Sequence, residues 1–177
     1  MTTIDPTLRG QTIQEPILEA IAARLIDQIE DYNDQNCFIC DQAIPISLPG
    51  GRIGCTVSIG PGRFPSEFFG GGGHDTLTED GSVVITPILA INLDRPRRAR
   101  RKIVERDDQT KGLLFYKGAI LRALFAFPWE PSEGDQPLLR DLISPLSCDD
   151  PQDVAIGETM ATAMKMRIST VFDWRLT

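Results

Sequence analysis

The segment MKMRISTVFDWRL, residues 164–176, carries the most regular pattern in the sequence. Apolar residues and one threonine occupy one parity, at Met164, Met166, Ile168, Thr170, Phe172, Trp174 and Leu176. Polar residues occupy the other parity, at Lys165, Arg167, Ser169, Asp173 and Arg175, with Val171 as the exception. Because successive side chains of a strand point to opposite faces, this alternation predicts an amphipathic strand of about 40 Å at ~3.3 Å per residue. We expect one face of this strand to pack on helices.

Two segments are predicted to form those helices. Residues 16–31, PILEAIAARLIDQIED, form an amphipathic helix whose apolar stripe repeats every four positions, at Ile17, Ile21, Leu25 and Ile29. Residues 110–127, with Thr110 as a candidate N-cap, form a helix that is apolar on nearly every side. Only Lys117 and Arg122 interrupt its apolar surface. Such a helix indicates either a deep core position or a face reserved for a partner.

Two further strands are predicted between the helices, separated by a long flexible loop. Residues 53–59 alternate apolar and small residues, and residues 83–94 form the second strand. Pro87 in this second strand predicts a sheet edge or a bulge, because proline cannot donate to the hydrogen-bond ladder. The loop covers about residues 60–82, which is longer than most connections, and loops of such length tend to be functional or disordered.

The remaining segments complete a single α/β (α+β) domain over residues 1–177. Residues 138–147 are predicted to form a short strand or irregular edge, and residues 148–158 a turn region. The predicted order is α–β–β–α–β–β. We expect an antiparallel or mixed sheet with two main helices packed against it.

Composition limits the class of protein. With 177 residues, 41% hydrophobic and 24% charged, the chain is typical of a globular domain. No apolar run approaches the roughly 18 residues of a transmembrane helix, and the first residues lack the pattern of a signal peptide. We therefore expect a protein without a membrane association, folded in a reducing cytoplasm with four unbridged cysteines.

The charge is unevenly distributed. Residues 95–106, RPRRARRKIVER, hold seven of the 18 basic residues, whereas the rest of the chain holds 11 basic and 24 acidic residues. The candidate interface residues in this basic segment are Arg97, Arg98, Arg100, Arg101 and Lys102. Clustered arginines can bind nucleic-acid phosphates or carboxylates of another subunit. The acidic remainder and the lack of interleaved aromatic residues favour the subunit interface.

The segment FFGGGGHDTLTEDGSV, residues 68–83, contains four consecutive glycines and the only histidine, His74. A phosphate-binding loop requires a Lys-Ser/Thr pair after the glycines and a following helix, and neither is predicted here. The pattern therefore favours a loop that acts through its shape, with glycines that permit rearrangement on docking. Its candidate docking residues are Phe68, Phe69, Gly71, Gly72 and His74.

Thiol or metal chemistry is the main alternative. Cys37 and Cys40 form a CxxC motif, and His74-Asp75 resembles part of a metal site. Cys55 and Cys148 could in principle complete a four-thiolate set. However, the second CxxC pair that makes a zinc site specific is absent, and so is a second histidine. No GxSxG motif indicates a nucleophile, so no catalytic residue is assigned.

The order of elements, together with ILEAIAARL (17–25) and ISTVFDWRLT (168–177), resembles the tail terminator (neck) proteins of tailed bacteriophages. The resemblance implies a small α/β domain that forms a hexameric ring, caps the tail tube, ends its polymerisation and provides a docking surface for the head. It implies neither catalysis nor a cofactor. Head-closure and other connector proteins of the neck remain alternatives, as does a small metal- or thiol-dependent enzyme using Cys37, Cys40 and His74.

The resemblance also implies the partners and the location. The implied partners are further copies of the chain, the tail tube protein and a head-side connector or stopper protein. DNA would pass through the ring without specific binding, and the protein would be made in the host cytoplasm and reside in the virion.

Overall fold

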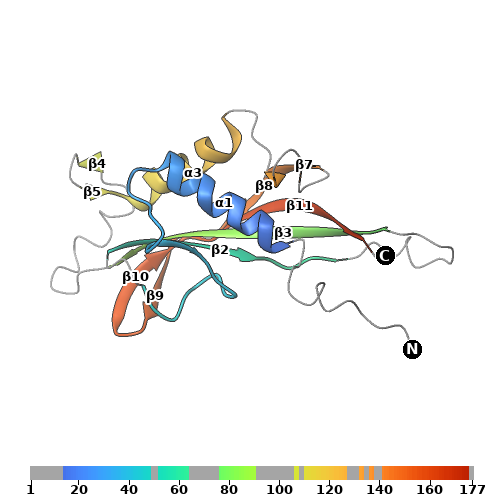
Figure 1. Ribbon diagram of the computed structural model, residues 1–177. Coiled ribbons are helices and arrows are strands. Elements are labelled where there is room, and N and C mark those ends of the chain that lie inside the picture. Colours follow the sequence, from blue (N-terminus) through green and yellow to red (C-terminus); the bar gives the residue numbers. More distant parts are fainter. Residues whose placement is uncertain are drawn as a thin grey trace.

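Strand β3 (Thr76–Ala90) lies at the centre of the fold, and the other strands of the main sheet are arranged on either side of it (Figure 1). The structure is a computed structural model, which describes residues 14–48, 52–63, 76–90, 106–107, 110–126, 132–133, 136–137 and 141–175.

The main sheet has seven strands: β1 (Cys37–Ile39), β2 (Ile53–Ile59), β3, β8 (Asp141–Cys148), β9 (Gln152–Ile156), β10 (Thr159–Ala163) and β11 (Met166–Arg175). One edge of β3 pairs with β2, whereas its other edge pairs with β11 over residues 76–85 and with β10 over residues 88–90. The β1–β2 pair is parallel and the other pairs are antiparallel, so the sheet is mixed. Two short two-stranded sheets complete the described strands: β4 (Arg106–Asp107) with β5 (Thr110–Lys111), and β6 (Ser132–Glu133) with β7 (Gln136–Pro137).

Helices α1 (Gln14–Gln28) and α3 (Leu113–Phe125) cover one face of this sheet (Figure 1). The apolar side chains on the inner faces of the two helices pack against the strand side chains that point to this face of the sheet. The main core includes Ile17, Ile21, Leu25, Cys55, Val57, Val83, Ile85, Leu113, Tyr116, Ile120, Met166 and Ile168. Burial of these side chains is the main favourable contribution to folding. The predicted α+β fold with two helices packed on a sheet is confirmed.

The opposite face of the sheet carries a smaller apolar cluster. There Ile88, Ile156, Ala161 and Ala163 are buried together, with Ile44 and Leu48 packed against them. The β9–β10 hairpin lies on this side, away from the helices (Figure 1). The two faces of the molecule therefore differ: helices cover one, and a hairpin with the segment 41–48 covers the other.

Pro87 lies within central strand β3, so the predicted sheet edge is wrong. Its register partner is Cys55 of β2, but the Cys55 amide donates to the Asn36 carbonyl on the β1 side (2.7 Å). The amide position of Pro87 therefore faces the other edge of β3, where residues 164–165 link β10 to β11. At this link the Pro87 carbonyl accepts a hydrogen bond from the Met164 amide (3.2 Å). The strand tolerates proline because its missing donor falls in the gap between two pairing strands.

Several predicted boundaries are also wrong. Thr110 belongs to β5, and Gly112 is the N-cap of α3. Residues 148–158, predicted as a turn region, include strand β9 and the turn to β10. Likewise β3 begins at Thr76, so residues 76–82 are strand and not part of a loop over residues 60–82. Strands β5 and β9 form through local hairpin pairing with β4 and β10, whereas residues 76–82 form a strand through long-range pairing with β11, which no local pattern reveals.

The outer half of β3 forms an arm with β11. Residues 76–81 pair with residues 170–175 in continuous antiparallel register, beyond the last β2 pair at Ile59–Val83. The arm extends past the end of α1 (Figure 1). The predicted terminal strand is thus confirmed over Met166–Arg175, with β10 as a separate strand before it.

Two glycines, Gly157 in the β9–β10 turn and Gly118 in α3, provide a matched test of the assigned backbone conformation. Gly157 has φ of 57°, so Gly157→Ala is expected to lower the free energy of unfolding by about 1 kcal/mol. Gly118 lies inside α3 with open space where the methyl group of an alanine would lie. Gly118→Ala is therefore expected to raise the free energy of unfolding by about 0.5–1 kcal/mol. Urea unfolding of both variants measures the difference, and equal effects of the two substitutions would contradict the assigned turn.

Candidate functional site

Most residues that the sequence analysis singles out lie outside the described residues. These are Arg97, Arg98, Arg100, Arg101 and Lys102 of the basic segment, and Phe68, Phe69, Gly71, Gly72 and His74 of the glycine loop. The structure therefore bears on the remaining candidates, which are the cysteines, and on sites that the sequence did not reveal.

The structure brings Cys37 beside Cys55, not beside Cys40. Cys37 and Cys55 are register partners on β1 and β2, and both are buried, whereas Cys40 is half-buried and Cys148 is exposed. Burial raises the pKa of the Cys55 thiol well above its usual range, and the adjacent Cys37 raises it further. A buried thiol of raised pKa is a poor nucleophile and a poor metal ligand. No group of three or more histidine, cysteine, aspartate or glutamate residues is placed for metal binding among the described residues.

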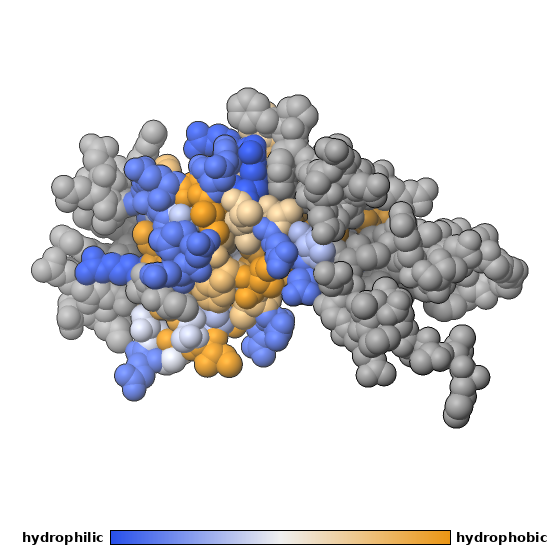
Figure 2. Space-filling view, viewed as in Figure 1, coloured by the Kyte–Doolittle hydropathy of each residue, from blue (hydrophilic) through white to orange (hydrophobic). Residues whose placement is uncertain are grey.

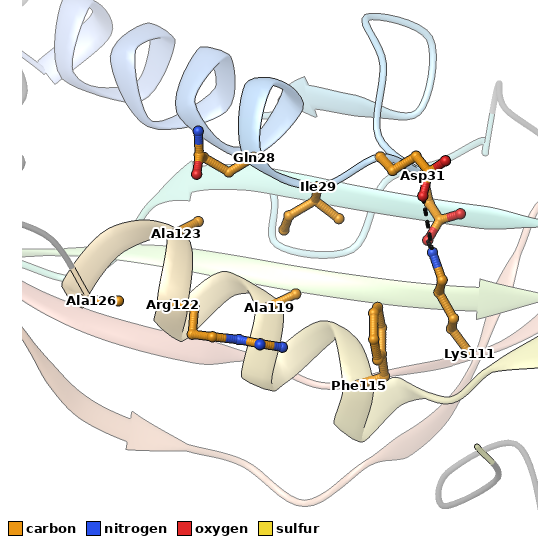
Figure 3. A pocket seen from close by; sticks show the side chains of 10 residues that line it. Gln28, Ile29, Asp31, Lys111, Phe115, Ala119, Arg122, Ala123 and Ala126 are labelled. Atoms are coloured by element: carbon orange, nitrogen blue, oxygen red, sulfur yellow. Dashed lines mark hydrogen bonds and ion pairs between the residues drawn. The ribbon is translucent and has the colours of Figure 1, made fainter. Parts of the chain in front are cut away.

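A cleft between α1 and α3 is the candidate site. Its volume is about 380 Å³. It is lined by Gln28, Ile29, Glu30, Asp31, Lys111, Phe115, Ala119, Arg122, Ala123 and Ala126 (Figure 3). This α1–α3 cleft has an apolar floor of alanines, with Asp31 and Lys111 at one end and the Arg122 guanidinium extending along it.

The chain after α1 fixes Asp31 at the end of the cleft. A compact turn follows the helix, in which the Asn33 amide donates to Asn36 Oδ1 (2.8 Å). The side-chain amide of Asn36 in turn donates to the Asp31 carbonyl (2.8 Å). Asparagine side chains commonly stabilise such turns by bonding nearby backbone groups. The position of Asp31 is thus set by local hydrogen bonds.

The Asp31 carboxylate joins the end of α1 to the start of α3. Its Oδ2 accepts hydrogen bonds from Lys111 Nζ (2.6 Å) and from the Tyr116 hydroxyl (3.1 Å). Lys111 Nζ also lies 3.9 Å from Glu30 and 5.2 Å from the centre of the Phe115 ring. Because this carboxylate oxygen accepts hydrogen bonds from two donors near the start of α3, Asp31 is suited to hold the two helices together.

Two stacked tyrosines lie beneath this ion pair. The rings of Tyr32 and Tyr116 are 5.5 Å apart at an interplanar angle of 19°. Burial raises the pKa of Tyr116, and the negative charge of Asp31 and the hydrogen bond to it raise it further. Burial also raises the pKa of Tyr32 well above its usual value, with smaller contributions from Cys55 and Cys37. Both phenols therefore stay neutral at physiological pH.

The tyrosine pair predicts an unusual alkaline titration. Tyr32 and Tyr116 are the only tyrosines of the chain, and both have raised pKa values. They favour the folded state below about pH 10, and this stabilisation is lost as the pH rises toward their folded values. We expect almost no tyrosinate absorbance near pH 10 while circular dichroism shows folded protein. Urea-unfolded protein is the control and should titrate near pH 10; a one-tyrosine step there in the folded protein would contradict the site geometry.

Arg122 is the distinctive group of the cleft. It is exposed, and it has no ion-pair or hydrogen-bond partner for its side chain within the part of the chain that the structure describes. In contrast, Arg24 of α1 donates through Nε to the Ala123 carbonyl (3.1 Å) and links the two helices. The cleft can therefore bind a group that combines an apolar part with a carboxylate. The sequence contained a signal for this site, since Arg122 is one of two charges that interrupt the apolar surface of α3.

Neither the scan against protein-family models nor the search of curated proteins gives a match. Within the described ranges, neither helix has both the length and the apolar character needed to cross a membrane.

Proposed function

We propose that this protein is a structural virion protein of a phage neck, a tail terminator that forms a ring on the end of the tail tube. The resemblance of residues 17–25 and 168–177 to that family provides the specific function. The observation that carries the assembly role is the β3–β11 arm, which extends past the helical layer. The end of this arm, residues 76–79 with 172–175, is two-stranded among the described residues, and a two-stranded ribbon is marginally stable in water, so contact with a neighbouring subunit would stabilise it.

In this role the protein ends tube polymerisation and offers a surface to the head-side connector. Its neighbours are identical copies in a ring, the tail tube protein below and the connector or stopper protein above. Each subunit of such a ring needs two different complementary surfaces, because one surface contacts the preceding subunit and the other contacts the next subunit. The unlike faces of the sheet, with helices on one and a hairpin on the other, are compatible with such contacts.

Light scattering and negative-stain microscopy of the purified protein test the ring. We expect a species near six times 19.6 kDa that shows rings of one diameter. A protein that stays monomeric over a wide concentration range would contradict the ring.

Deletion of the gene from the phage that carries it tests the terminator role separately. A terminator predicts tail tubes of uncontrolled length, since nothing ends polymerisation. Tails of normal length beside unattached filled heads would instead identify a head-closure protein.

A further inference from the structure

The segment 41–48 brings an exposed apolar residue to the turn of the β9–β10 hairpin, which contains an exposed acid. Ile46 is 84% exposed, more than any other large apolar side chain among the described residues. Its carbonyl oxygen lies 3.5 Å from where a side chain on Gly157 would begin, so the segment 41–48 contacts the hairpin turn. Glu158, the second residue of that turn, is exposed. We call Ile46, Gly157 and Glu158 the hairpin tip.

The charges of the hairpin and of α3 are complementary. The hairpin, residues 152–163, contains Asp153 and Glu158 and no basic residue. Helix α3 contains Lys117 and Arg122 and no acidic residue. Complementary patches of this kind orient partners and suppress wrong pairings.

The α1–α3 cleft has the composition that the hairpin tip requires. Its alanine floor, between Ile29 and Phe115, can receive an isoleucine side chain. The Arg122 guanidinium along the cleft can bind a carboxylate through paired hydrogen bonds (Figure 3). At about 380 Å³ the cleft is at the small end of the range for ligand pockets, roughly 300–1,000 Å³, which suits a few side chains better than a large ligand.

The hairpin tip cannot reach the cleft of its own chain. The cleft lies on the helical side of the sheet, whereas the hairpin lies on the other side (Figure 1). In the same view, Figure 2 shows apolar surface at the lower end of the molecule, over the hairpin side. The α1–α3 cleft that complements the hairpin tip is therefore the cleft of a second copy.

We infer that the hairpin tip of one copy docks into the α1–α3 cleft of the next copy. Ile46 packs on the alanine floor and the Glu158 carboxylate binds the Arg122 guanidinium. Because the two patches are different and lie on opposite sides of the subunit, the contact can repeat from copy to copy, and it forms the proposed ring when the rotation between copies closes. This inference rests on the proposed ring and assigns one of its contacts.

Charge reversal with rescue is the experiment that tests the contact. Arg122→Glu and Glu158→Arg, each alone, place like charges opposite each other and are expected to raise the concentration of half-dissociation about 10- to 100-fold. The double variant restores an opposite pair, so its half-dissociation concentration is expected to return toward the wild-type value. Sedimentation velocity over a dilution series measures all four proteins, and circular dichroism confirms that each is folded.

Two further variants separate the contact from general effects. Lys117→Glu makes the same charge change on the same helix outside the cleft lining, and it is expected to weaken assembly far less than Arg122→Glu does. Ile46→Ser alters an exposed side chain that the fold does not need, and it is expected to weaken assembly about 10-fold through the loss of apolar burial.

The outcomes distinguish this contact from the ring itself. If wild-type protein forms the oligomer and Arg122→Glu leaves it intact, the contact is wrong and the ring stands. If both single variants dissociate and the double variant does not recover, the pairing of Arg122 with Glu158 is wrong. If the wild-type protein is monomeric at every concentration, both the ring and the contact are wrong.

Discussion

Replacing Ile120 with alanine is expected to lower the free energy of unfolding by about 3 kcal/mol. Ile120 is fully buried in α3 and belongs to the core cluster that joins both helices to β2, β3 and β11. The substitution removes apolar burial and leaves a cavity in a layer that has elements on several sides, so little collapse can fill it. Urea unfolding followed by circular dichroism measures this loss. The slope of the unfolding free energy against urea concentration should stay unchanged if the folded state keeps its compactness.

Leu114→Ala is the matched control for this substitution. Leu114 belongs to the same helix, but it is 46% exposed, so the loss is expected to be no more than about 1 kcal/mol. If the two variants lost similar stability, the assigned orientation of α3 on the sheet would be incorrect.

The second large effect is expected for Asp31→Ala, at about 2 kcal/mol. This variant leaves Lys111 without its closest acid and the buried Tyr116 hydroxyl without an acceptor. A buried polar group that loses its hydrogen-bond partner still bears the free-energy cost of desolvation, and this lowers the stability of the folded state. Adding Tyr116→Phe to Asp31→Ala should therefore cost less than Tyr116→Phe in the wild type, and a double-mutant cycle measures this coupling.

Glu30→Ala provides the control for the charge. Glu30 also lies near Lys111, at 3.9 Å, but its side chain is 93% exposed, and exposed ion pairs contribute little. We expect a change below about 0.5 kcal/mol.

In the double-mutant cycle, additive effects of Asp31→Ala and Tyr116→Phe would show that the hydrogen bond between Asp31 and Tyr116 contributes nothing to stability.

The parts of the fold that could be predicted from sequence are those whose burial follows a simple period. Strand β2 lies at the predicted residues 53–59, and Ile17, Ile21, Leu25 and Ile29 of the first helical segment are all buried. The first half of β3 could not be predicted, because TLTEDGS has no apolar alternation and is a strand through its pairing with β11 and, at Asp80, with Arg63. The prediction for Pro87 is wrong because the effect of a proline depends on which neighbour its amide position faces.

The candidate site was less predictable for a related reason. Asp31 meets Lys111 and Tyr116 across 80 and 85 positions of the chain, and no local spacing encodes such a contact. Cys37 and Cys40 had a recognisable spacing, yet strand register places Cys37 beside Cys55. Arg122 could be recognised as a break in an apolar helix, but only the packing of α1 beside α3 turns it into part of a cleft.

The pairing of β3 with β11 has a consequence for synthesis of the chain. Partners in this ladder are separated by 81 to 99 residues, from Ile85–Met166 to Thr76–Arg175. At translation rates of about 5–20 residues per second, the outer half of β3 leaves the ribosome roughly 5–20 s before its partner exists. During that time its unpaired edge is open to other nascent chains. The adjacent acids Glu79 and Asp80 lie in this unpaired segment, and we expect repulsion between these acids on neighbouring chains to disfavour aggregation until β11 is made.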